Sequence, residues 1–159
     1  MTTASLTVPV LRASRRRGQN DMIWNRRKDR SGSYVAFISY SHADGGEARR
    51  LHRWLERYTI PASCRTNSRW LRPVFRDEEE FAASPDLGAQ IRSALDRSRA
   101  LIVICSDTAA SSRWVDEEIR HFVASHPTLP LLAALTVDGE QSFPSSMPPA
   151  LRRAHEGGP

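Results

Sequence analysis

The segment Tyr34-Val-Ala-Phe-Ile-Ser-Tyr40-Ser41 decides the fold class of this chain. Its residues are apolar, β-branched or aromatic until polar groups replace them, and this composition predicts a buried strand that ends at a turn. A second segment, Ala100-Leu-Ile-Val-Ile-Cys105, is apolar at every position, as a central strand covered on both faces must be. If both strands belong to one parallel sheet, the residues that follow them meet at its C-terminal edge, where open α/β sheets bind ligands.

Strand and helix periods alternate along the rest of the sequence. Apolar residues recur three or four positions apart in regions that begin near 47, 86 and 112, which predicts three amphipathic helices. Short apolar runs predict strands near 34–40, 73–76, 100–105 and 130–136. The sequence therefore predicts an α/β fold, with a parallel sheet of four to five strands in the flavodoxin-like order and helices on both faces.

The positive charge of the chain is concentrated in its first 33 residues. They contain eight Arg or Lys against two Asp, a net charge of +6, whereas residues 34–159 contain 15 basic and 16 acidic residues, a net charge of −1. The basic clusters Arg15–Arg17 and Arg26–Lys28 could touch nucleic acid or anionic lipid, but no amphipathic or aromatic pattern accompanies them. We interpret residues 1–33 as a disordered, solvated leader, and the expected partners include neither nucleic acid nor a membrane.

Length and composition predict a single folded domain. A chain of 159 residues with 40% hydrophobic content can bury one core but hardly two. We expect this domain at 34–140, followed by an irregular or truncated segment at 141–159, where three prolines interrupt any regular pattern. Two cysteines are too few for a disulfide framework, and no apolar run has the length of a membrane span, so we expect a cytoplasmic protein.

The residues Trp114 and Glu118 stand four positions apart in the predicted helix that follows the central strand. This spacing places an aromatic ring and a carboxylate on one helix face. Taken alone, each residue has a simpler explanation, because a glutamate on an amphipathic helix is usually solvated and a tryptophan is usually part of a core. A functional role for the pair therefore needs further support.

Such support comes from a resemblance that runs from about Tyr34 to Val137. Four segments resemble, in order and spacing, the successive boxes of a Toll/interleukin-1 receptor (TIR) domain of the bacterial type: Phe37-Ile-Ser-Tyr-Ser-His-Ala-Asp44, Val74-Phe-Arg-Asp-Glu-Glu-Glu-Phe81, Leu101-Ile-Val-Ile-Cys-Ser106 and Ser112-Arg-Trp-Val-Asp-Glu-Glu-Ile119. The resemblance implies a five-stranded parallel sheet wrapped by helices. It also implies a mobile loop after the second strand, at about 81–86.

Many bacterial members of this family cleave NAD+ at the nicotinamide–ribose bond, with a glutamate in a Trp-x-x-x-Glu pattern. That glutamate corresponds to Glu118, whereas Glu117 points about 100° away around the helix. Departure of nicotinamide leaves an oxocarbenium-like cation on the ribose, which a nearby carboxylate stabilises. The resemblance therefore implies Glu118 as the catalytic residue and NAD+ as a substrate, with no cofactor. The implied substrate-binding residues are Ser39, Tyr40, Ser41, His42, Phe81, Ser106 and Trp114.

Two other functions remain open from the sequence. Other TIR domains are scaffolds that associate with themselves or with other TIR and sensor proteins in signal transduction, and here the loop at 81–86 would make the contact. A phosphoacceptor like that of a receiver domain would use Asp77, but the paired acids and the lysine that such a site requires are missing. The acidic run Asp77–Glu80 does not predict a metal site, because consecutive loop residues cannot all face one ion. The favoured hypothesis is an NAD+ hydrolase in bacterial signalling or anti-phage defence.

Overall fold

A four-stranded parallel sheet forms the centre of the molecule. The computed structural model describes residues 33–65, 68–76 and 85–156. Its strands are β1 (Ala36–Ser39), β2 (Val74–Arg76), β3 (Leu101–Cys105) and β4 (Leu131–Leu135), arranged in the order β2-β1-β3-β4 with every pair parallel. The first strand is internal, and each strand lies within two residues of its predicted position. The predicted α/β class and flavodoxin-like order are confirmed.

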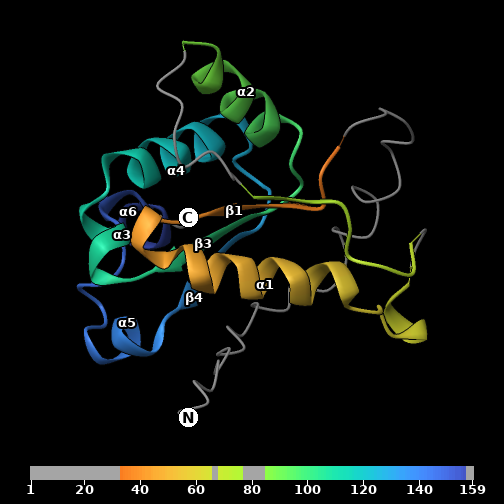
Figure 1. The fold of residues 1–159 in the computed structure, drawn as a ribbon. Coiled ribbons are helices and arrows are strands. Elements are labelled where there is room, and N and C mark those ends of the chain that lie inside the picture. Colours follow the sequence, from red (N-terminus) through yellow and green to blue (C-terminus); the bar gives the residue numbers. More distant parts are fainter. Residues whose placement is uncertain (1–32, 66–67, 77–84, 157–159) are drawn as a thin grey trace.

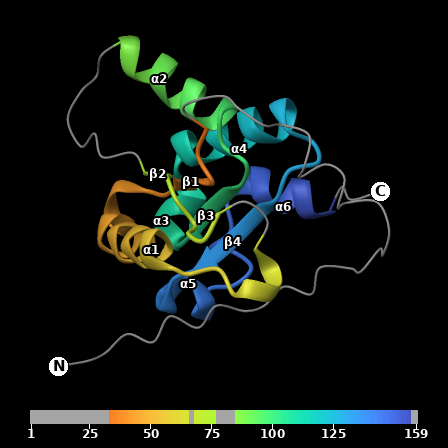
Figure 2. The ribbon, with the colours of Figure 1, turned by 90° about the vertical axis from the view of Figure 1, so that its right-hand side faces the viewer.

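Helices cover both faces of this sheet. The longer ones are α1 (Gly45–Arg57), α2 (Pro85–Asp96), α4 (Arg113–Ser125) and α6 (Pro149–Glu156), and the short ones are η1 (His42–Asp44), η2 (Ala62–Cys64), α3 (Asp107–Ser111) and α5 (Val137–Gln141). Figures 1 and 2 show α1 and α4 on opposite sides of the strands. Among the described residues no helix is both long and apolar enough to cross a membrane.

Side-chain alternation along the strands divides the core into two clusters. Phe37, Leu101 and Val103 point to one face, where they pack against residues of α2, α4 and α6. Ile38 and Ile102, one position along in their strands, point to the other face and pack against α1. The buried residues of α4 are Val115, Ile119 and Phe122, at the helical spacing that the sequence predicts. This packing fixes which face of α4 is turned toward the sheet.

The outer edge of β2 is covered by two side chains of α1. The Val74 amide donates to Oε1 of Glu56 at 2.6 Å, and the Val74 carbonyl oxygen lies 3.0 Å from Nε2 of His52. Both backbone groups of an edge residue are therefore satisfied within the domain. An edge strand blocked in this way is protected from pairing with another chain.

The expectation of an irregular segment after residue 140 is wrong for residues 149–156, which form α6. The prolines that suggested irregularity do not prevent this helix, because Pro149 occupies its first position. At that position the fixed φ of proline fits a helix and its missing N–H group would have no partner in any case. Ala150 and Leu151 are buried against α4 and the sheet.

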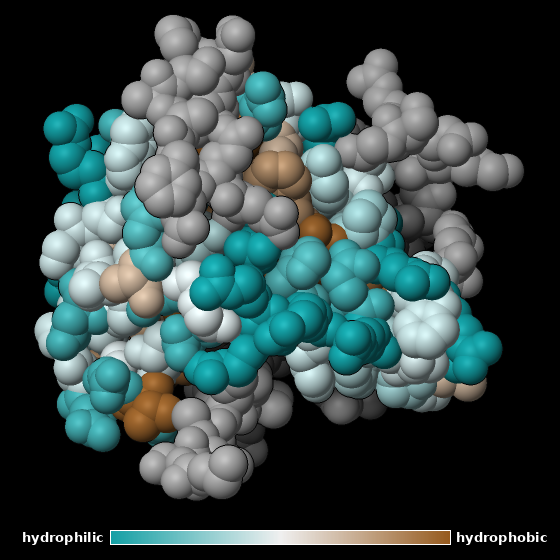
Figure 3. All heavy atoms as spheres, viewed as in Figure 1, coloured by the Kyte–Doolittle hydropathy of each residue, from teal (hydrophilic) through white to brown (hydrophobic). Residues whose placement is uncertain are grey.

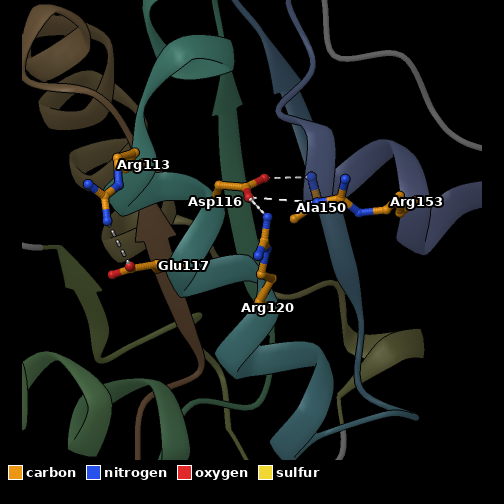
Figure 4. A network of polar contacts seen from close by, with 6 residues as sticks. All are labelled: Arg113, Asp116, Glu117, Arg120, Ala150 and Arg153. Carbon is orange, nitrogen blue, oxygen red and sulfur yellow. Dashed lines mark hydrogen bonds and ion pairs between the residues drawn. The ribbon is translucent and has the colours of Figure 1, made fainter.

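Asp116 of α4 holds the N-terminus of α6 (Figure 4). Its Oδ1 accepts a hydrogen bond from the Ala150 amide at 2.6 Å, while Oδ2 pairs with Arg120 at 2.5 Å and Arg153 at 3.7 Å. A carboxylate at this position satisfies an amide that has no partner within the helix and interacts favourably with the helix dipole. Residues 34 positions apart are thereby joined.

Replacing Asp116 by Asn should lower the free energy of unfolding by about 1–2 kcal/mol. The substitution removes the negative charge at the helix N-terminus and the ion pairs with Arg120 and Arg153. Urea denaturation measures this difference. Glu117→Gln is the matched control, because Glu117 is exposed and lies 4.0 Å from Arg113. It should change stability by less than about 0.5 kcal/mol. Equal effects of the two changes would contradict the capping role.

Candidate active site

The proposed catalytic residue, Glu118, is hydrogen-bonded to the C-terminal end of β1. Ser39 Oγ donates to Oε2 of Glu118 at 2.5 Å. Ser39 follows Phe37 by two residues, so both side chains point to the same face of the sheet, and Phe37 is in the cluster that contains Ile119 of α4. Ser39 is only 1% exposed, whereas Glu118 is half-buried. The fold thus places a partly accessible carboxylate at the edge where parallel sheets bind ligands.

A buried carboxylate, Asp44, lies at the same edge and is 7% exposed. Its Oδ2 accepts hydrogen bonds from Ser41 and Ser106, each at 2.6 Å, and lies 3.3 Å from the hydroxyl of Thr108. Ser41 follows β1, and Ser106 follows β3. Asp44 therefore links the ends of the two central strands.

The hydroxyl groups around Asp44 form a closed arrangement. Thr108 Oγ1 lies 2.8 Å from Oγ of Ser41 and 2.9 Å from Oγ of Ser106, and its single proton can go to only one neighbour at a time. Ser106 also accepts from the Ala109 amide as the N-cap of α3. A charged group at this depth requires such donors, because leaving it unpaired would be costly.

The same carboxylate affects Cys105. Burial, and secondly the negative charge of Asp44, raises the pKa of the Cys105 thiol to about 12. The thiol is therefore protonated at neutral pH and is a poor nucleophile. Cys105 belongs to the core of β3 and takes no part in the candidate chemistry.

The other predicted site residues lie around this edge in different environments. Trp114 is 72% exposed in the first turn of α4, so it is not a core residue, and its ring is open to a ligand. His42 is exposed at the start of η1. Tyr40 lies on the α1 side, where its hydroxyl accepts from Nη1 of Arg76 at 3.2 Å. Phe81 and most of the predicted loop at 81–86 lie outside the described residues, as do residues 1–32 of the predicted leader.

Sequence reasoning named Ser41 and Ser106 but gave no role to Asp44 or Thr108. In the structure both serine hydroxyls are bonded to Asp44, so they position the site, and their contact with a substrate remains a prediction. The available signal was a set of polar residues directly after two strands that are neighbours in the sheet. Only the strand order shows that these polar residues lie at one site, because it places β1 beside β3.

No group of three or more His, Cys, Asp or Glu side chains that could hold a metal ion occurs within the described ranges. Asp77–Glu80 are not among these residues. Two surface hollows lie away from Glu118, one between α4, β4 and α6 and one along α1. Neither hollow is lined by a carboxylate or by the C-terminal end of a strand, so the candidate site lies at the sheet edge with Glu118 and Asp44.

Comparison with known proteins shows the family to which this chain is similar and its fold. The model of the family "Thoeris protein ThsB, TIR-like domain" matches residues 37–139. The chain is 39% identical over 136 residues to the NAD(+) hydrolase ApTIR of Actinoplanes sp., a match that covers 75% of this chain and 18% of that protein. The chain thus spans under a fifth of that relative's length. The TIR domains of the activated Roq1 resistosome, which directly recognises the pathogen effector XopQ, have a similar fold, with a TM-score of 0.52 and 19% identity, over 78% of this chain and 69% of that chain.

Removing the acceptor at Asp44 should destabilise the protein more than removing its charge alone. Asp44→Ala leaves buried hydroxyls without an acceptor and should cost about 2–4 kcal/mol in the free energy of unfolding. Asp44→Asn can keep an oxygen at the Oδ2 position and should cost about 1–2 kcal/mol. Chemical denaturation of the two variants beside the unchanged protein tests this order. Equal stability of all three would mean that the network does not hold the strand ends together.

Proposed function

Because this chain belongs to the TIR-like domain family of the Thoeris protein ThsB, we propose that it is an NAD+ hydrolase that cleaves the bond between nicotinamide and ribose. The observation that carries the proposal is the hydrogen bond between Ser39 and Glu118, which orients a half-buried carboxylate at the sheet edge. The identity to an NAD(+) hydrolase over most of this chain supports it. We place the reaction in the cytoplasm, as part of bacterial signalling or defence.

In the proposed reaction the C–N bond between ribose and nicotinamide breaks, and its electron pair leaves with nicotinamide. The nicotinamide ring is already cationic in NAD+, so it leaves as a neutral molecule without protonation. Positive charge develops on the ribose, and the Glu118 carboxylate stabilises it. Water then adds to the ribose carbon and releases a proton, which gives ADP-ribose and nicotinamide. NAD+ is thus consumed as a substrate, with no separate cofactor.

The surrounding residues have supporting roles in this proposal. Ser39 fixes the direction of the Glu118 carboxylate through its hydrogen bond. The exposed ring of Trp114, one helical turn before Glu118, offers a flat apolar surface against which the nicotinamide or the adenine ring can stack. Asp44 holds the ends of β1 and β3 in register beneath them. Self-association through TIR contacts would bring further groups to this edge.

Exchange of Glu118 for Gln should reduce nicotinamide release by about a hundredfold or more, which corresponds to about 3 kcal/mol of lost transition-state stabilisation. Glutamine keeps the shape and part of the hydrogen bonding but removes the charge that stabilises the cation. The assay measures free nicotinamide from NAD+ at high protein concentration with a crowding agent, because TIR domains act as assemblies in this proposal.

Glu117→Gln is the matched control, because Glu117 is adjacent, exposed and turned toward Arg113 (Figure 4). It should keep nearly full activity. If both variants release nicotinamide as fast as the unchanged protein, Glu118 has no catalytic role. If the unchanged protein releases none under these conditions, the TIR scaffold becomes the better description.

A further inference from the structure

The folded part of the chain is nearly neutral overall, yet its charges are strongly segregated. Residues 48–76 contain eight arginines and a single acidic residue, Glu56, for a net charge of +7. The other residues of 34–159 contain seven arginines and fifteen acidic residues, for a net charge of −8. A summed charge of −1 therefore conceals a strongly basic region within the domain.

The exposed side of α1 concentrates this charge beside two aromatic rings. A surface groove of about 460 Å³ is lined by Arg50, Arg53, Trp54, Arg57, Tyr58 and Thr59. We call these residues the α1 face. All three arginines are exposed, and Trp54 is 56% exposed, with its ring centroid 5.1 Å from that of Tyr58. In Figure 3 a band of hydrophilic side chains crosses the molecule where α1 lies.

Acidic neighbours neutralise little of the α1 face. Glu47 pairs with Arg50 one turn earlier in the helix. Glu56 is turned toward β2, where it accepts from the Val74 amide at 2.6 Å and lies 4.0 Å from His52. Arg53 and Arg57 therefore present their charges to solvent beside the exposed Trp54 ring.

The segment after α1 adds more groups of the same kind. Thr59 forms an antiparallel bridge with Trp70, and the Ile60 amide donates to the Arg69 carbonyl oxygen at 2.9 Å. The guanidinium groups of Arg69 and Arg72 lie over the Trp70 ring, at 5.5 and 5.0 Å from its centroid. Arginine and aromatic residues thus alternate along two adjoining segments.

We infer that the α1 face binds single-stranded nucleic acid, with phosphate groups on Arg53 and Arg57 and a base stacked on Trp54. Proteins that bind single strands combine a positive groove with aromatic rings on which bases stack, and arginine binds phosphate in a two-pronged fashion. An acidic peptide would pair with the arginines but would gain little from the exposed indole ring of Trp54. The basic leader, by contrast, has no such aromatic pattern.

Most of the α1 face lies in or after the C-terminal half of α1, away from the candidate active site. Helix α1 begins beside Asp44 at the C-terminal edge of the sheet and runs to the other edge, where Arg57 and Tyr58 lie (Figure 1). Nucleic acid on this face therefore does not compete for Glu118, and the inference does not rest on the proposed function. A binding assay without NAD+ tests it separately.

Fluorescence anisotropy with a labelled single-stranded DNA of mixed sequence and about 20 nucleotides provides the test, with the full chain in every case. The variant R53A/R57A should weaken binding at least tenfold and reduce the slope of log affinity against log salt by about 1.4, for two lost phosphate contacts. Trp54→Ala should weaken binding about tenfold through lost stacking, with an unchanged salt slope. Circular dichroism confirms that each variant remains folded.

The matched control is R92A/R152A, which removes the same charge from exposed positions on α2 and α6, on the other face of the sheet. It should leave the affinity within about twofold of the unchanged protein and should leave the salt slope unchanged. Equal losses in the control and in R53A/R57A would overturn the inference, because binding would then follow net charge or the leader. Competition by poly-glutamate as strong as that by unlabelled DNA at equal charge would also overturn it, in favour of an acidic protein partner.

Discussion

The candidate site depends on one electrostatic constraint, the presence of the buried carboxylate of Asp44 between the ends of β1 and β3. An ion at this depth is tolerated only if donors surround it, and the chain supplies them from both strands through Ser41, Ser106 and Thr108. The two central strand ends are therefore held at a fixed separation. Because Ser39 is the last residue of β1, its position is fixed by the same contacts.

The orientation of α4, which carries Glu118, is set by its N-terminal cap and by its buried apolar side chains. Ser106 caps α3 and Ser112 caps α4, so the chain after β3 turns twice within a few residues before α4 begins. Val115, Ile119 and Phe122 then bury one side of α4 on the sheet. With that side fixed, Glu118 accepts a hydrogen bond from Ser39. Asp116 contacts α6, and Glu117 is exposed (Figure 4).

Much of this arrangement could be predicted from the sequence because it depends on local periodicity. The apolar run of β3 and the helical spacing of α4 specify their own structure, and the Trp-x-x-x-Glu pattern singled out Glu118 through a family resemblance. Helix α6 was missed because Pro149 stops a helix in the interior but fits its first position. The spacing alone also could not decide whether Trp114 is buried.

Other features depend on groups that are far apart in the sequence. Asp44 and Ser106 are 62 positions apart, and nothing in either segment shows that they share a hydrogen bond. The basic α1 face is different, because its residues are close together in the sequence. It was missed because a net charge summed over residues 34–159 cancels the arginines of 48–76 against acidic residues elsewhere. The fold adds that Arg53, Trp54 and Arg57 are exposed together.

A double-mutant cycle between Ser39→Ala and Glu118→Gln, with nicotinamide release from NAD+ as the readout, tests most directly the claim that β1 positions the catalytic carboxylate. If Ser39 acts through Glu118, the serine change alone should slow the reaction, and it should have little further effect once Glu118 is Gln. The account predicts a coupling energy of about 1–3 kcal/mol. Additive losses in the two single variants and the double variant would contradict it. They would mean that the hydrogen bond between Ser39 and Glu118 does not contribute to catalysis.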